Sequence, residues 1–190
     1  MSGLVVKVDA GAIANMAARV GAIPKKIRPA MRMAVNDTGD RTRTPMKKAL
    51  VQQTGLKPKV ITAAIKTDRA TDATLTYRMT TRGGNIRLKY FGARETRAGV
   101  SAAPWNSRRV FGGTFIKGGR FPRRVSIAKL NGQAYRRVGS KRLPIAVARS
   151  GLFIPKEMVI GATAAAFNAT TASVLPGRVA HHLGRAIGGR

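Results

Sequence analysis

Few side chains in this sequence could do chemistry. The chain has seven carboxylates and two histidines and lacks cysteine, which excludes disulfides and a thiolate metal site. Asp37 and Asp40 are three residues apart, so on a helix they would share a face and could begin a metal site. Hard cations require several oxygen ligands, however, and no third carboxylate is close in the sequence. Pairing of the two aspartates with the neighbouring Arg32, Arg41 or Arg43 is therefore the favoured interpretation.

The other candidates for catalysis or cofactor binding are weaker. His181 and His182 are adjacent, whereas metal-binding histidines on one helix are spaced i, i+4, so we interpret them as surface or interface residues. The glycine pairs at 112–113 and 118–119 lack the Gly-Lys-Ser/Thr ending of a phosphate-binding loop. We therefore expect no metal, no cofactor and no enzymatic activity.

Four pairs of basic residues are a stronger signal. They are Arg108-Arg109, Arg123-Arg124, Arg136-Arg137 and Lys141-Arg142. Neighbouring side chains on a strand point to opposite faces, so one member of each pair would face a given surface. The pairs predict a surface that contacts either DNA phosphates or acidic neighbouring subunits, and the sequence leaves both alternatives open. Aromatic residues make up only 5% of the chain, which favours phosphate contact over base reading.

The charge of the chain is large and uneven. The formal net charge of +29 opposes a compact monomer and implies a polyanionic partner or acidic neighbours. Residues 78–150 hold 18 lysines and arginines but one carboxylate, Glu95, which gives this segment a net charge of +17. No uncharged apolar run reaches the roughly 18 residues of a membrane span, so we expect no membrane contact.

Residues 31–65 are predicted to form a long helix, which opens at Pro24 or Pro29, then a glycine corner and a short helix. Apolar side chains recur with helical spacing along the first part. Gly55 followed by an apolar residue is typical of a Schellman stop, and Pro58 suits the first position of the next helix. Pro45 interrupts the long helix, so we expect a kink or a restart that Thr44 caps.

Alternating patterns and turn residues predict the remaining elements. A first strand over 4–8 and a helix over 10–20 precede the long helix. Hairpins are predicted over 74–90 and over 125–138, a short strand at 99–102, a hairpin or bulged strand over 108–117, and an edge strand at 143–147 that Pro144 limits. Helices follow from 154, with a break at Pro176-Gly177 and a last helix over 178–187.

This order predicts the α+β class, because helices and strands are segregated along the chain. We expect N-terminal helices, a central antiparallel β-sheet of hairpins, and C-terminal helices. One domain would span 1–190, with a helical part at 1–70, a basic β-rich part at 74–148 and C-terminal helices at 154–187.

Two blocks of residues carry a resemblance to a known family. The first comprises Ala34-Val35-Asn36-Asp37-Thr38-Gly39, Arg41, Ala49-Leu50 and Gln53-Thr54-Gly55-Leu56-Lys57, and the second Arg136-Arg137-Val138-Gly139, Lys141-Arg142-Leu143-Pro144-Ile145, Ile154-Pro155 and Met158. In this order and spacing the blocks, which span about 31–158, resemble the minor tail protein Z family of phage tail completion proteins. The interruption at Pro45 departs from the uninterrupted helix that the resemblance leads us to expect.

The resemblance implies a structural virion protein at the head-proximal end of a phage tail. Such a protein is needed for head–tail joining and for positioning of the DNA end, and it would be assembled in the host cytoplasm. Its partners would be tail terminator or tail tube proteins and neck connector proteins, with the DNA end and the tape measure protein as further candidates. Tube symmetry favours a homo-oligomeric ring, a hexamer or alternatively a trimer.

A second hypothesis explains the same charge. A basic, non-specific nucleic-acid-binding protein associated with the ribosome or the nucleoid would also carry a large positive charge. A binder of this kind would shift short duplex DNA by itself, whereas a completion protein would co-purify with tails.

Overall fold

The computed structural model describes residues 2–7 and 27–187. Its helices are α2 (Ile27–Thr54), α3 (Pro58–Ala64), α4 (Ile154–Met158) and α5 (Gly161–Ile187), with 3-10 turns η1 (Leu88–Phe91), η2 (Pro104–Asn106) and η3 (Ala128–Leu130). Its strands are β1 (Ser2–Lys7), β2 (Ile65–Asp68), β3 (Thr76–Thr81), β4 (Arg94–Thr96), β5 (Gly99–Ala102), β6 (Arg109–Gly112), β7 (Thr114–Phe115), β8 (Tyr135–Arg137) and β9 (Ile145–Val147). The predicted helix over 10–20 lies outside the described residues.

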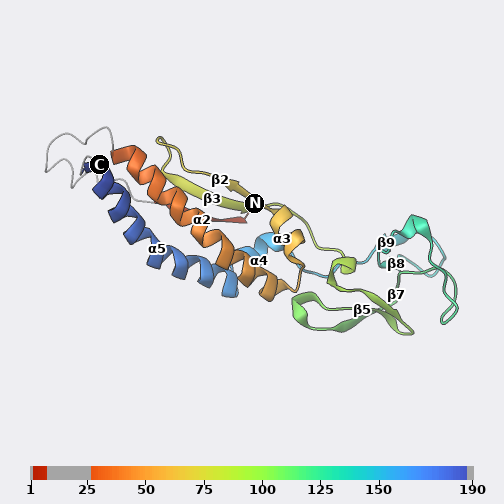
Figure 1. Ribbon diagram of the computed structural model, residues 1–190. Coiled ribbons are helices and arrows are strands. Elements are labelled where there is room, and N and C mark those ends of the chain that lie inside the picture. The colour runs from red at the N-terminus through yellow and green to blue at the C-terminus, as the bar shows by residue number, and fades with distance from the viewer. Residues whose placement is uncertain (1, 8–26, 188–190) are drawn as a thin grey trace.

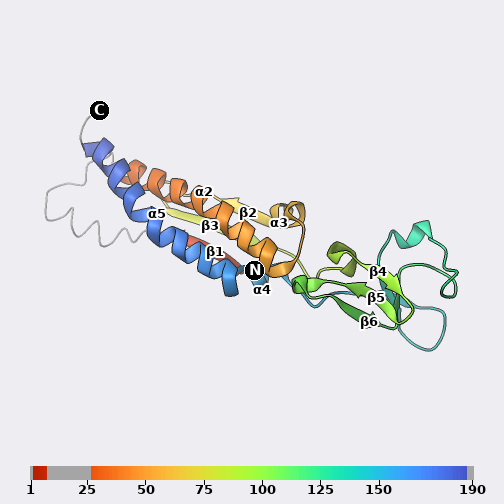
Figure 2. The same ribbon diagram turned by 60° about the horizontal axis from the view of Figure 1, so that its bottom comes forward.

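The predicted α+β class is confirmed. The strands form three small antiparallel sheets, with the orders β1-β3-β2, β4-β5-β6 and β7-β8-β9. The molecule is elongated, with α2, α5 and the first sheet at one end and the other two sheets at the opposite end (Figures 1 and 2). Helices α2 and α5 pack along each other and both contact the first sheet. Over the described ranges no helix is long and apolar enough to cross a membrane.

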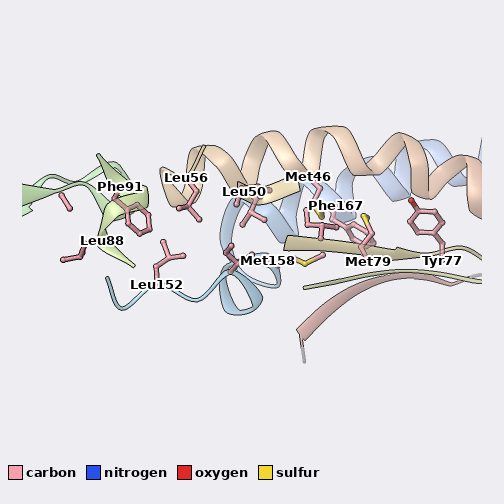
Figure 3. Packing of buried hydrophobic residues seen from close by; sticks show 14 of the residues in the cluster. Met46, Leu50, Leu56, Tyr77, Met79, Leu88, Phe91, Leu152, Met158 and Phe167 are labelled. Carbon is pink, nitrogen blue, oxygen red and sulfur yellow. The ribbon is translucent and has the colours of Figure 1, made fainter. Parts of the chain in front are cut away.

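The contact between α2 and the first sheet depends on Gly39. Tyr77 of β3 is fully buried under this helix, and its hydroxyl donates a hydrogen bond of 2.9 Å to Asp40 (Figure 3). A Cβ atom at Gly39 would lie 2.4 Å from the Tyr77 ring, far inside van der Waals contact. Helix and strand therefore approach this closely because position 39 has no side chain. Burial, with the hydrogen bond to Asp40, raises the pKa of Tyr77 to about 12, so the phenol keeps its proton.

Asn36, in the first of the two blocks that carry the family resemblance, fixes the loop that follows β2. The side chain of Asn36 donates to the carbonyl oxygen of Ala70 at 3.1 Å, and it accepts from the amide of Ala70 at 2.8 Å. The backbone amide and the backbone carbonyl of Ala70, a residue outside regular secondary structure, are thereby both hydrogen-bonded. The loop is thus held to the middle of α2.

One hydrophobic cluster extends through both ends of the molecule. Near the helices it contains Met46, Leu50 and Phe167, and toward the β-rich end it continues through Leu152 and Phe91 (Figure 3). Because a single cluster connects the helices to the second sheet, the core does not divide the chain into separately buried halves.

The Gln53 side chain joins α2 to the two C-terminal helices. Its amide nitrogen donates to the carboxylate of Glu157 at 2.8 Å, and its carbonyl oxygen accepts from the amide of Thr163 at 3.0 Å. The second contact satisfies a free N–H group in the first turn of α5. The other carboxylate oxygen of Glu157 accepts from the indole N–H of Trp105 in η2 at 3.0 Å. Four segments of the chain thus meet at one polar joint.

The glycine corner after α2 is present, with a different hydrogen-bond pattern from the predicted one. Gly55 has φ +73°, and its amide donates to the carbonyl of Val51 at 2.9 Å, the single bond of an αL cap. The amide of Leu56 donates to the Thr54 hydroxyl at 3.3 Å, so the second Schellman bond does not form. Thr54 is fully buried, and its hydroxyl supplies this alternative acceptor.

The predicted restart at Pro45 and the predicted break at Pro176-Gly177 are both wrong. Helix α2 runs through Pro45, and α5 runs through Pro176. Fully buried Thr42 and Met46 flank Pro45, so packing on both sides holds the helix together in spite of the lost hydrogen bond. In α5, Arg178 follows the proline and pairs with Asp37 of α2 at 3.1 Å, which anchors the second half of the helix.

The predicted hairpins over 74–90 and 125–138 are also wrong. Strand β3 pairs with β1 on one side and β2 on the other, so both its edges are occupied and residues 86–90 cannot join it. Strand β8 pairs with β7 and β9, while η3 replaces the strand predicted before Asn131-Gly132. The strand at 99–102 and the edge position of β9 are confirmed.

The segment over 108–117 is neither a hairpin nor one bulged strand. Strand β6 belongs to the second sheet and β7 to the third, and Gly113 with φ +68° connects them. A residue with a left-handed backbone lets the chain leave one sheet and enter another within one residue.

The close contact at Gly39 predicts opposite effects for two glycine substitutions in helices. Gly39→Ala should destabilise the protein by about 1–3 kcal/mol, because the new methyl group overlaps the Tyr77 ring. Gly184→Ala, in α5, meets no atom within 4 Å and should stabilise by about 0.5–1 kcal/mol through helix propensity. Thermal unfolding of both variants checks this, and an equal rise in Tm for both would contradict the close packing.

Candidate anion-binding site

The β-rich end contains a cavity of about 380 Å³ with a cationic lining. Its five basic residues are Arg97, Lys117, Arg124, Arg137 and Arg142, which come from the β4–β5 turn, from β8 and from the loops that flank β8. Three of them belong to the predicted basic pairs. Arg97 and Lys117 were missed because each stands alone in the sequence, and only the charge of the whole segment pointed to them.

Glu95, the one carboxylate of residues 78–150, supports the wall of this cavity. Its carboxylate forms an ion pair with Arg124 and accepts hydrogen bonds from the amides of Ile116 at 3.3 Å and Lys117 at 3.1 Å. The Glu95 side chain is only 9% exposed. Its charge is thus used inside the fold, and the other four lining cations form no ion pair within the part of the chain that the structure describes.

The two arginines of β8 lie on different surfaces, as the alternation of side chains along a strand predicts. Arg137 lines the cationic cavity, and its guanidinium lies 5.8 Å from the centre of the Phe115 ring. Arg136 instead lines a second hollow of about 470 Å³, together with Arg149. The predicted pair therefore does not form one patch.

The pair at 108–109 supports the fold near β6 while remaining exposed. Arg109 donates to the carbonyl of Ser150 at 3.1 Å and lies 4.8 Å from the centre of the Phe111 ring. Arg108 donates to the Ser101 hydroxyl at 3.3 Å. The Arg109 bond links the second sheet to the segment before α4, and the Arg108 bond reaches β5 of the same sheet, so both side chains take part in holding the fold together.

Arg123 and Lys141 are exposed and make no hydrogen bond or ion pair with the residues at 2–7 and 27–187. They are the partners in sequence of Arg124 and Arg142, which line the cavity. The eight predicted residues therefore divide into three that share the cavity and five that are distributed over other surfaces of the β-rich end.

The two neighbouring aspartates of α2 are paired with arginines. Asp37 lies 3.6 Å from Arg41 and 3.1 Å from Arg178, and Asp40 lies 2.9 Å from Arg69. Of the three arginines predicted as partners, only Arg41 pairs with either aspartate. The other two pairing arginines, Arg178 and Arg69, lie far along the chain and are brought to the aspartates by α5 and by the loop after β2. Among the described residues no group of three or more histidine, cysteine or carboxylate side chains could hold a metal ion.

The lining of the cavity can bind an oxyanion through charge and hydrogen bonds. Guanidinium groups present donors in a planar fork that matches phosphate and carboxylate oxygens.

The contacts of Glu95 predict a stability effect. Glu95→Gln should destabilise the protein by about 1–3 kcal/mol, because Arg124 loses its counter-charge in a mostly buried position. The double variant Glu95→Gln with Arg124→Met should be less destabilised than the single one, since no unpaired charge remains. Chemical denaturation measures both, and a single variant as stable as the parent would rule out this role.

The pairing of Asp37 predicts a pH dependence of stability. Burial raises the pKa of Asp37, but hydrogen bonds and charges from Arg178 and Arg41 lower it more, to below the ordinary 3.8. A lowered folded pKa means that the carboxylate stabilises the fold above pH 3.8 and that this contribution is lost as the pH falls through the folded pKa.

Asp37→Asn should therefore unfold more easily than the parent at about pH 6, and the difference should vanish near pH 2. Asp68→Asn, an exposed aspartate 3.8 Å from Lys66, changes the net charge equally and is the control. Urea unfolding across this range makes the comparison. If the difference in unfolding free energy between Asp37→Asn and the parent persists near pH 2, the charge of the carboxylate is not its cause.

Comparisons with known proteins give no relative for this chain. No protein-family model matches it, and neither a curated protein nor a solved structure matches it. The resemblance to the minor tail protein Z family therefore remains a prediction, based on the two residue blocks between 31 and 158.

Proposed function

We propose that this protein is a structural component of a phage virion, a tail completion protein at the head-proximal end of the tail that takes part in head–tail joining and in positioning the DNA end. The observation that carries this proposal is the net charge of +17 on residues 78–150, combined with the resemblance of the two residue blocks. The role requires binding rather than catalysis, so the protein is proposed not to be an enzyme.

The distribution of charge in the molecule supports a partner that is acidic or rich in phosphate. At the helical end the aspartates that the structure describes are paired with basic side chains, whereas at the β-rich end the one carboxylate, Glu95, is paired with Arg124. Unpaired cations at one end of an elongated molecule repel each other until an anion binds. Contact with the DNA end or with acidic neck or tail subunits would remove this repulsion.

A tail protein of this kind would act as a closed ring of identical subunits. We propose a hexamer, with a trimer as the alternative, because a tube with rotational symmetry is best matched by a ring of the same symmetry. The cationic ends would then be repeated around the axis. Tail terminator, tail tube and neck connector proteins are the proposed partners, the tape measure protein is a further candidate, and assembly would take place in the host cytoplasm.

The second candidate is a basic nucleic-acid-binding protein associated with the ribosome or the nucleoid. The uncompensated cations of the β-rich end favour it equally well when they are considered alone. The purified protein would then retard short duplex DNA as a monomer or dimer, with an affinity that falls steeply with salt. Co-purification with tails distinguishes the completion protein from it.

Charge reversal tests the proposed role of the β-rich end. Replacing Arg136, Arg137, Lys141 and Arg142 with glutamate should block head–tail joining and leave the fold intact, because exposed charges contribute little to stability. The matched control reverses four exposed basic residues of the helical end and of the corners beside it, Lys48, Lys57, Lys59 and Arg82.

The measurement is complementation of a phage that lacks its own copy, with filled heads joined to tails counted by electron microscopy. We expect joining to fall at least tenfold with the first variant and to remain near the parent level with the control. Normal joining by a well-folded variant of the β-rich end would contradict the proposal.

A further inference from the structure

We propose that the cationic cavity of the β-rich end binds one nucleotide of an unpaired DNA or RNA strand, with its phosphate against the arginines and its base against an apolar wall. This inference deepens the proposed function and rests on its DNA contact, since it names the form of nucleic acid that the β-rich end takes.

The size of the cavity is the first observation. Its volume of about 380 Å³ falls in the lower part of the range for small-ligand sites, roughly 300–1,000 Å³. A duplex presents its phosphates on a broad convex surface and cannot enter such a space. A flexible single strand can place one nucleotide in it.

The cationic wall is the second observation. Four of the five lining cations are arginines. Of these five cations, only Arg124 has an acidic partner within the described part of the chain. The four cations without an acidic partner repel one another, and an oxyanion in the cavity would relieve that repulsion.

The apolar wall is the third observation and decides between single strand and duplex. Phe115, Ile127 and Leu143 line the same cavity, and the last two are 45% and 66% exposed. Bases stacked inside a duplex cannot reach such a wall. An unpaired base can stack on an aromatic ring or lie against apolar side chains.

An acidic peptide is the competing ligand. Carboxylates would also satisfy arginine forks, but each brings a single charge on a short side chain and leaves the apolar wall uncovered. A nucleotide supplies the anion and the flat apolar group in one unit. Charge and shape together therefore favour the nucleotide.

The test uses fluorescence anisotropy with the full-length protein and three probes. They are a 5′-phosphorylated thymidine hexanucleotide, a blunt duplex long enough to stay paired, whose affinity is compared per phosphate, and a hexaglutamate peptide, all labelled at the far end. We expect the single strand to bind at least tenfold more tightly than either of the others. Tighter binding of the peptide or the duplex would overturn the inference.

Variants test the apolar wall and the cationic wall of the cavity independently. Leu143→Ala and Phe115→Leu leave the charge unchanged and should weaken single-strand binding about 5-fold or more, with little effect on the duplex. Arg137→Gln with Arg142→Gln should weaken it further and flatten the salt dependence, by about 0.7 in the slope of log K for each phosphate that is no longer neutralised. Lys59→Gln with Arg82→Gln makes the same charge change outside the cavity and is the control.

The outcomes distinguish this inference from the proposed function. If both double variants weaken binding equally, the contact is diffuse and the cavity is not a site, although a tail role remains open. If the apolar variants bind the single strand like the parent, no base occupies the cavity. Loss of head–tail joining with unchanged binding of all three probes would preserve the tail role and remove the nucleotide site.

Discussion

The side chain of Gln53 is the contact on which the arrangement of the molecule most depends. It stands at the end of α2, donates to Glu157 and accepts from the first turn of α5. Glu157 is buried and has no cationic partner among the described residues, so its carboxylate relies on Gln53 and on Trp105. A buried anion that lost either donor would be strongly destabilised. The indole of Trp105 thereby ties the β-rich end to the helical end, alongside the hydrophobic cluster that runs through both.

Around this joint the two ends of the molecule are stabilised differently. The helical end combines an apolar core with paired charges, and Gly39 allows β3 to lie directly under α2. The β-rich end has small sheets and one internal ion pair, and it carries most of the uncompensated charge. Repulsion among these cations lowers the stability of the free protein and raises its affinity for an anion. An anion bound at this end would relieve the repulsion and stabilise it.

Local patterns in the sequence predicted the elements whose contacts lie close along the chain. The glycine at 55, the short helix after it and the short strand at 99–102 all follow from near neighbours. Strand pairing could not be predicted in the same way. The edges of β3 are occupied by β1 and β2, so the alternating residues after 85 had no free edge to join. The helices continue through Pro45 and Pro176 because α2 and α5 hold each other, an interaction that no local rule contains.

The sequence by itself determined the α+β class, the large positive charge and the segment in which that charge is concentrated. The tertiary structure alone decided which cations act together. Arg97, Lys117, Arg124, Arg137 and Arg142 line one cavity, although they are spread over 46 positions of the chain. Arg136, adjacent to Arg137, faces a different hollow. The physical reason is that charge depends on composition, whereas a binding site depends on distances between side chains, and these are set by strand pairing and packing across the whole fold.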